Sequence, residues 1–174
     1  VMDADGTNVV NLTQDGLSDE GVWSPEGRQI AVRKNLSELW IMDADGGSPT
    51  QVPLPEDVMM GGVLSWSAEG DRIAYNCTVG EANDLEVCAV NTDGSDWANL
   101  TNNPGYDFGA VWSPTGDKIA FMSQRDGDNE IYIMDADGSN QVRLTYNPAE
   151  DECPCWSPDG RKIAFQSTRT GSGD

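Results

Sequence analysis

The stretch Trp112-Ser113-Pro114-Thr115-Gly116-Asp117-Lys118-Ile119-Ala120 decides the fold, because it recurs along the chain. Close copies begin at Trp23, Trp66 and Trp156, so successive copies lie 43 to 46 residues apart. Internal repeats of this period are typical of solenoids and propellers. The sequence therefore predicts a repeat array, in which function depends on sites added to the scaffold.

Each repeat is predicted to hold four short strands. In the unit that contains Trp112 the strand-like stretches cover 109–113, 118–123, 130–134 and 141–145, and Gly- and Asp-rich turns separate them. Strands of this length joined by such turns are typical of antiparallel all-β structure, and no useful stretch has a helical period. We therefore expect an all-β propeller in which each repeat forms one four-stranded antiparallel blade.

The two ends of the chain carry complementary halves of a blade. We expect a single β-propeller domain over 1–174, with repeats near 14–57, 58–101 and 102–145, and a fourth made by joining 146–174 with 1–13. If one chain joins these halves, a hybrid closing blade completes a four-bladed monomer. If two chains exchange them, an eight-bladed dimer results, and the third alternative is a piece of a longer array.

The recurring tryptophans and glycines are predicted to be structural. Because the four rings occupy one position in every unit, we expect them between neighbouring sheets and not as platforms for a ligand. Glycines such as Gly116 and Gly138 follow polar residues where tight hairpins need a positive φ.

Charge and composition restrict the partners. The formal net charge is −20, from 30 acidic and 10 basic residues, so we expect no nucleic acid partner and favour basic proteins or small cationic ligands. No apolar stretch reaches the roughly twenty residues of a spanning helix, so no membrane insertion is expected. The chain begins at Val1 and not at Met, so the lack of a leader says little about the compartment.

The motifs as a whole resemble the TolB-type β-propeller repeat. The likeness rests on Trp156-Ser157-Pro158-Asp159-Gly160 and on Ile131-Tyr132-Ile133-Met134-Asp135-Ala136-Asp137-Gly138, and it covers essentially the whole chain. The unit around Trp66 departs most, with Ala68 in place of proline. Similar propellers occur in a periplasmic protein of the Tol-Pal envelope system, in secreted proteins and as the non-catalytic lid of prolyl-oligopeptidase-like enzymes. The resemblance implies a periplasmic or extracellular location.

The predicted function is binding and not catalysis. The chain has no histidine, which excludes Ser-His-Asp and Cys-His arrangements, and it has no Gly-x-Ser-x-Gly motif. We expect a scaffold that presents loops around a central channel to a protein partner or a small cationic ligand. The alternative is an accessory propeller of a peptidase-like or other hydrolytic enzyme, including a carboxylate-based hydrolase at the channel mouth. A third class is a structural unit that forms a homodimer.

Three aspartates form the candidate metal site. Asp19, Asp107 and Asp151 precede the tryptophan of their units by four or five residues, and the matching place before Trp66 is Gly61. The innermost strands of a propeller surround the central channel, so residues that enter these strands ring one mouth of it. Their carboxylates are predicted to bind Ca²⁺, the one cofactor expected, while the alternative is that they only start loops.

The remaining polar motifs have structural explanations. The Asp-x-Asp-Gly turns, such as Asp135 to Gly138, carry the first half of a calcium loop but lack its later ligands, so we expect the aspartates to accept local backbone hydrogen bonds. Cys77 and Cys88 fall on facing strands of one unit and are predicted to form a cross-strand disulfide. Cys153 and Cys155 flank Pro154 and suit either a thiolate pair or a strained bridge.

Overall fold

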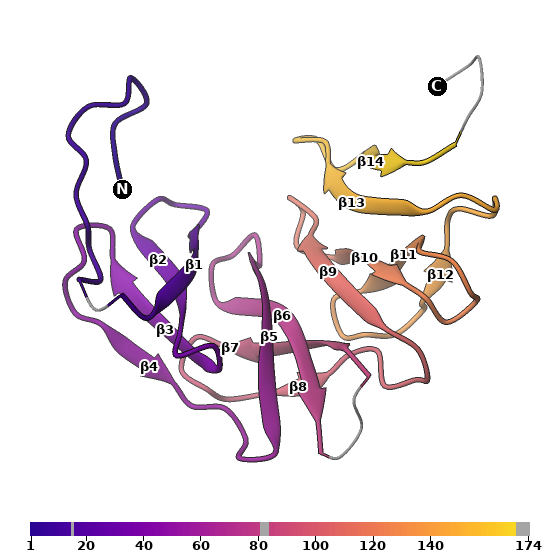
Figure 1. Ribbon diagram of the computed structural model, residues 1–174, viewed down its shortest axis with the longest axis horizontal. Coiled ribbons are helices and arrows are strands. Elements are labelled where there is room, and N and C mark those ends of the chain that lie inside the picture. The colour runs from indigo at the N-terminus through magenta and orange to yellow at the C-terminus, as the bar shows by residue number, and fades with distance from the viewer. Residues whose placement is uncertain (15, 81–83, 170–174) are drawn as a thin grey trace.

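The computed structural model describes residues 1–14, 16–80 and 84–169, and the strands found there form four antiparallel sheets. Figure 1 shows the sheets following one another around an open arc. The first sheet holds β1 (Ser18–Trp23), β2 (Gln29–Lys34), β3 (Glu38–Asp43) and β4 (Thr50–Val52). The second holds β5 (Val58–Trp66), β6 (Arg72–Val79), β7 (Glu86–Asn91) and β8 (Ala98–Asn99). The third holds β9 (Asp107–Trp112), β10 (Lys118–Ser123), β11 (Glu130–Asp135) and β12 (Val142–Arg143), and the last β13 (Asp151–Trp156) and β14 (Ile163–Ser167).

Each four-stranded sheet is a blade, because its strands pair in sequence order. The first strands of neighbouring blades contact one another, β1 with β5, β5 with β9 and β9 with β13. This arrangement places β1, β5, β9 and β13 on the inner side of the arc (Figure 1). The predicted all-β propeller fold, with four-stranded antiparallel blades, is confirmed. Within the described ranges no helix is long and apolar enough to cross a membrane.

The core lies between neighbouring blades. Leu39 and Tyr75 belong to the cluster between the first and second blades, and Phe121 and Met134 to the cluster between the second and third. All four side chains are almost fully buried. Burial of apolar surface from two sheets at each joint is the main source of stability in such a fold.

The repeated tryptophans join one blade to the next. Trp66 and Trp112 are buried in the clusters between blades, as predicted. The indole N–H of Trp156 donates a hydrogen bond to the carbonyl oxygen of Val111 in the preceding blade at 3.1 Å. Trp23 differs, because its side chain is half exposed.

The two ends of the chain do not form the hybrid blade within a single chain. Within the described residues β14 pairs only with β13, and Figure 1 shows β14 and the N-terminal segment at opposite ends of the arc. Residues 1–13 form a small hairpin, in which the N–H of Val10 donates to the carbonyl oxygen of Val1 at 2.8 Å. The four-bladed monomer is therefore not what this chain adopts.

Candidate functional site

The three predicted site aspartates lie where inner strands begin. Asp107 and Asp151 are the first residues of β9 and β13, and Asp19 is the second residue of β1. We call this the aspartate end of the arc. Gly61, which takes their place in the second blade, lies within β5 and carries no carboxylate.

Asp19 is exposed and paired with an arginine of the neighbouring strand. Nε and Nη2 of Arg33 on β2 donate to the two carboxylate oxygens of Asp19 at 2.9 and 2.6 Å. These hydrogen bonds and the positive charge of Arg33 hold the pKa of Asp19 below its ordinary value.

Asp107 is fully buried and also has an arginine partner. Nη2 of Arg125, which follows β10, donates to Oδ2 of Asp107 at 2.9 Å, and Nδ2 of Asn103 donates to the same oxygen at 2.9 Å. Burial raises the pKa of Asp107 against the opposing effects of Ser123, Arg125 and Asn103. Burial raises the pKa of Glu86, and the negative charge of Asp107 raises it further.

Asp151 repeats this arrangement one blade later. Nη2 of Arg169 and Nδ2 of Asn147 donate to Oδ2 of Asp151 at 2.6 and 2.7 Å, and Oγ of Ser167 donates to Oδ1 at 2.5 Å. Burial opposes ionisation here too, but the hydrogen bonds from Ser167, Arg169 and Asn147 prevail and the pKa of Asp151 is lowered.

The aspartate end therefore presents ion pairs and not a cluster of free carboxylates. Among the residues that the structure describes, no three His, Cys, Asp or Glu side chains come together as metal ligands. Asp19, Asp107 and Asp151 belong to separate blades, and each already has a guanidinium as its counter-ion. A calcium ion at this end would compete with these arginines for the carboxylates, and calcium binding stays a prediction.

Sequence reasoning missed the arginines and asparagines of these ion pairs. A usable signal exists, because Asn103 and Asn147 each precede their aspartate by four residues, and Arg125 and Arg169 each follow it by eighteen. Arg33 follows Asp19 by only fourteen residues, so the pattern is not regular in the first blade.

A pocket lies at the opposite ends of the inner strands, where the repeated Trp-Ser-Pro turns converge. It has a volume of about 420 Å³, and its lining includes Trp66, Trp112, Trp156, Pro25, Pro114 and Pro158 from four successive repeats. We call it the Trp-Ser-Pro pocket. None of its lining side chains is a carboxylate, a lysine or an arginine. Its size and apolar lining fall in the range of ligand sites.

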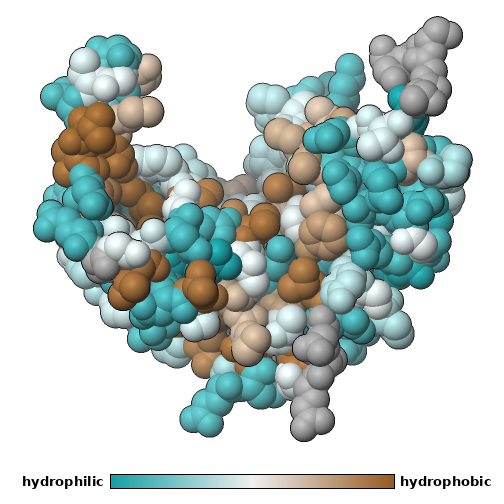
Figure 2. Space-filling view, viewed as in Figure 1, coloured by the Kyte–Doolittle hydropathy of each residue, from teal (hydrophilic) through white to brown (hydrophobic). Residues whose placement is uncertain are grey.

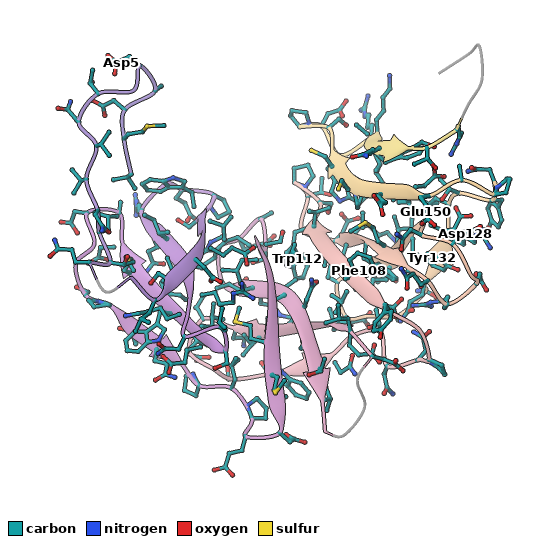
Figure 3. All side chains as sticks on the ribbon, in the orientation of Figure 1. Asp5, Phe108, Trp112, Asp128, Tyr132 and Glu150 are labelled. Carbon is teal, nitrogen blue, oxygen red and sulfur yellow. A yellow bond between two sulfur atoms is a disulfide. The ribbon has the colours of Figure 1, made fainter. Side chains whose placement is uncertain are left out.

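Trp112 differs from Trp66 and Trp156 in the surroundings of its indole N–H. Its ring lies between the second and third blades (Figure 3), and the residue is only 7% exposed. The indole N–H of Trp112 has no hydrogen-bond partner among the described residues, whereas those of Trp66 and Trp156 donate to backbone carbonyls. Buried donors without a partner are uncommon in folded proteins.

Acidic side chains surround the pocket. Glu26, Glu69 and Asp159 follow the lining residues of their turns and are exposed. Two of the carboxylates reach the glycine of the next turn. If Gly70 carried a Cβ atom, that atom would lie 3.0 Å from Oε2 of Glu26, and a Cβ on Gly116 would lie 2.6 Å from Oε2 of Glu69. On the inner side of the arc as a whole, Figure 2 shows an open hollow bordered by both polar and apolar residues.

The Asp-x-Asp-Gly turns have the structural role predicted for them. In each turn the second aspartate accepts a backbone hydrogen bond two residues on, for example Asp137 from Ser139 at 2.9 Å and Asp45 from Gly47 at 2.8 Å. The hydroxyl and N–H of Ser139 hold the pKa of Asp137 below its ordinary value.

The predicted disulfide is formed. Cys77 and Cys88 are bonded across β6 and β7, with their Cα atoms 5.9 Å apart, and both are fully buried. Cys153 and Cys155 are free and exposed.

A match to a known protein family agrees with this fold. The family model described as the TolB beta propeller domain matches residues 29–174. The chain belongs to this family. The predicted relationship to TolB-type propeller repeats is thereby confirmed.

The matching relatives and solved structures are longer than this chain. The Tol-Pal system protein TolB of Anaeromyxobacter dehalogenans (strain 2CP-C) is 38% identical over 114 residues, which cover 63% of this chain and 25% of that protein. The chain thus matches about a quarter of that relative's length. The crystal structure of TolB from Acinetobacter baumannii superposes with a TM-score of 0.79 at 21% identity, covering 99% of this chain and 43% of that one. An oligogalacturonate lyase in complex with manganese has a TM-score of 0.81 at 14% identity, covering 98% and 52%, which shows a shared fold alone.

Proposed function

We propose that the chain is a non-catalytic binding module that takes an extended segment of a partner protein in the Trp-Ser-Pro pocket. One observation carries this proposal: turns from four successive repeats converge on a single apolar pocket of about 420 Å³. Aromatic and proline side chains form rigid apolar surfaces, which bind extended or proline-rich segments at a small cost in conformational entropy.

The charge around the pocket defines the partner further. Glu26, Glu69 and Asp159 surround an uncharged floor, and the whole chain has a net charge of −20. An aromatic or proline anchor flanked by lysine or arginine fits such a site, since charges at the edge of an interface favour encounter with the opposite charge.

The comparisons support a protein partner. The relative from Anaeromyxobacter dehalogenans is named for a Tol-Pal system, and we infer that this chain likewise works by contact with other proteins. The Cys77–Cys88 disulfide supports a periplasmic or extracellular location, because such bonds persist in oxidising compartments.

Catalysis has less support than binding. The Trp-Ser-Pro pocket has no carboxylate in its lining, and the buried carboxylates of Asp107 and Asp151 are engaged by arginines at the other end of the strands. The fold shared with an oligogalacturonate lyase does not transfer that activity. Calcium at the aspartate end remains a separate prediction, and its test is given below.

The test is selection of peptides from a random displayed library on the purified chain. We expect enrichment of aromatic or proline residues next to lysine or arginine. Ala68→Phe, which fills the pocket from the second turn, should abolish binding of the selected peptides. Glu26→Gln with Glu69→Gln should weaken binding by about threefold to tenfold and reduce its dependence on salt.

The matched control is Glu56→Gln with Asp57→Asn, which removes two exposed charges next to β5, away from the pocket. This variant should bind like the parent chain. Peptides that bind the Ala68→Phe variant equally well would contradict the proposal, and so would a library from which nothing is enriched.

A further inference from the structure

Two free cysteines lie two residues apart on the inner strand of the last sheet. Cys153 and Cys155 on β13 are both exposed, while Pro154 between them is buried. The register between β13 and β14 shifts between Glu152 and Cys155, and φ of Cys153 is +54°. Burial thus alternates along this bulged stretch, and both cysteines are exposed.

A third sulfur atom lies against the first of these cysteines. The backbone N–H of Cys153 donates to Sδ of Met122, on β10 of the preceding blade, at 3.1 Å. The equivalent N–H groups at the two earlier joints donate to side-chain oxygen atoms instead: Val63 to Glu20 at 2.8 Å and Gly109 to Asn76 at 2.9 Å. A thioether is a weak acceptor compared with a carboxylate or an amide. At the joint that carries the two thiols, the acceptor of this N–H is therefore a sulfur atom, whereas at the two earlier joints it is an oxygen atom.

We propose that Cys153, Cys155 and Met122 bind a soft monovalent metal ion, of the type of Cu(I). Two thiolates and a thioether are the donors that such an ion prefers, and they are poor ligands for Ca²⁺ or Mg²⁺. Binding replaces the two thiol protons by the metal and involves no change of oxidation state. The strongly acidic chain favours a cation at this position.

The other two cysteines do not compete for the metal. Cys77 and Cys88 are joined to each other and fully buried. Cys155 also lines the Trp-Ser-Pro pocket, so the metal would sit beside the site proposed for the partner segment. The metal proposal does not depend on that function.

The test is a competition for Cu(I) between the whole chain and the chromophoric chelator bicinchoninate, in oxygen-free buffer with ascorbate, which leaves disulfides intact. We expect one equivalent of Cu(I) to move to the parent chain. Cys153→Ser and Cys155→Ser should each weaken binding about a hundredfold, and Met122→Leu about tenfold. Met59→Leu, at an exposed methionine of β5, is the matched control and should bind like the parent.

Two measurements keep the proposal falsifiable. Thiol titration of the native chain should find two reactive thiols, and circular dichroism should show every variant folded. The proposal is overturned if the double Cys153→Ser, Cys155→Ser variant takes up Cu(I) as the parent does, or if the parent takes up none. It is also overturned if no thiol reacts in the native chain, because the pair is then closed as a disulfide. Equal affinity of the parent and Met122→Leu would remove Met122 from the site and contradict the three-sulfur arrangement.

Discussion

The indole N–H of Trp66 donates a hydrogen bond to the carbonyl oxygen of Val22 at 3.1 Å, across the joint between the first and second blades. Trp112 occupies the same position one blade later and is as deeply buried, yet its N–H has no partner in the described part of the chain. Comparing the two tryptophans therefore distinguishes the contribution of the hydrogen bond to stability from the contribution of the buried ring.

Trp66→Phe should destabilise the fold more than Trp112→Phe. Both changes remove ring volume from a core between blades, but only Trp66→Phe also leaves the carbonyl oxygen of Val22 without its donor. The difference in the free energy of unfolding should be about 1 kcal/mol, measured by urea denaturation. Equal losses in the two variants would mean that the indole hydrogen bond contributes nothing to the joint.

Asp107 and Asp151 should affect the pH dependence of stability in opposite directions. The pKa of Asp107 is raised on folding, so the folded state holds its proton more tightly and stability declines as the pH rises from the ordinary aspartate range through the folded pKa. The pKa of Asp151 is lowered, so its contribution is present above the ordinary value and is lost as the pH falls through the folded pKa.

Asparagine at each position tests this contrast. Asp107→Asn should flatten the decline of stability on the alkaline side of the ordinary aspartate pKa, and Asp151→Asn should flatten the loss on the acid side. At neutral pH Asp151→Asn should be the more destabilising of the two. Urea denaturation across pH 3 to 7 measures both slopes, and identical profiles for the two variants would contradict the assignment.

Calcium at the aspartate end predicts a definite thermal response. If the ion binds there, Ca²⁺ should raise the melting temperature and a chelator should lower it, because a ligand that binds only the folded state stabilises it. Asp107→Asn with Asp151→Asn should abolish the response, while Asp45→Asn in an Asp-x-Asp-Gly turn should leave it intact. A melting temperature indifferent to both additions would leave Arg125 and Arg169 as the only counter-ions.

Removing the disulfide should cost more than removing the exposed thiols. Cys77→Ala with Cys88→Ala should lower the free energy of unfolding by about 3 kcal/mol, since the bond closes a short loop between two buried strands. Cys153→Ser with Cys155→Ser, at exposed positions, should change it little. Thermal or urea unfolding under non-reducing conditions compares the two, and the order of the losses is the outcome to check.

The hairpin at 1–13 should allow two copies of this 174-residue chain to associate. Its pairing of Val1 with Val10 matches that of Ile133 with Val142 in the third blade, and the side chain of Val10 is half exposed. Figure 2 shows apolar surface on this segment. We expect it to add to the open edge of β14 in a second copy.

The register of that pairing can be tested by charge reversal. In the third blade Lys118 pairs with Asp135, and the equivalent residues are Lys162 and Asp3. Lys162→Glu should shift the mass measured by light scattering from two chains toward one, and adding Asp3→Lys should restore two. A parent chain with the mass of one chain at all concentrations would rule out this association.

The sequence repeat predicted the blades, but it did not predict the angle between neighbouring blades. Local spacing and turn chemistry were enough to predict several features of the blades. These are the burial of Trp66 and Trp112, the disulfide, and the local hydrogen bonds of the turn aspartates. Closure into a hybrid blade depends on the angle between neighbouring sheets, which is set by packing of side chains such as Tyr75 and Phe121 and not by the length of the repeat.

The site was predicted only in part for a similar reason. The positions of Asp107 and Asp151 at strand starts followed from the propeller pattern. Their arginine partners lie eighteen residues further on, beyond a hairpin, and that spacing alone does not show that the side chains meet. The Trp-Ser-Pro pocket is assembled from turns that are about 44 residues apart, and each turn alone resembles an ordinary hairpin. Only the curvature of the arc brings them together.

The joints between blades also bear on how such a chain changes in evolution. The bulged inner strands β5, β9 and β13 are each held by the blade just before them, as Cys153 is held by Met122. The indole N–H groups of Trp66 and Trp156 likewise donate to the preceding blade. Duplication or loss of one whole repeat would therefore create or delete one joint and leave the others as they are. Such a change would nevertheless alter the mouth of the arc, because every repeat contributes one turn to it.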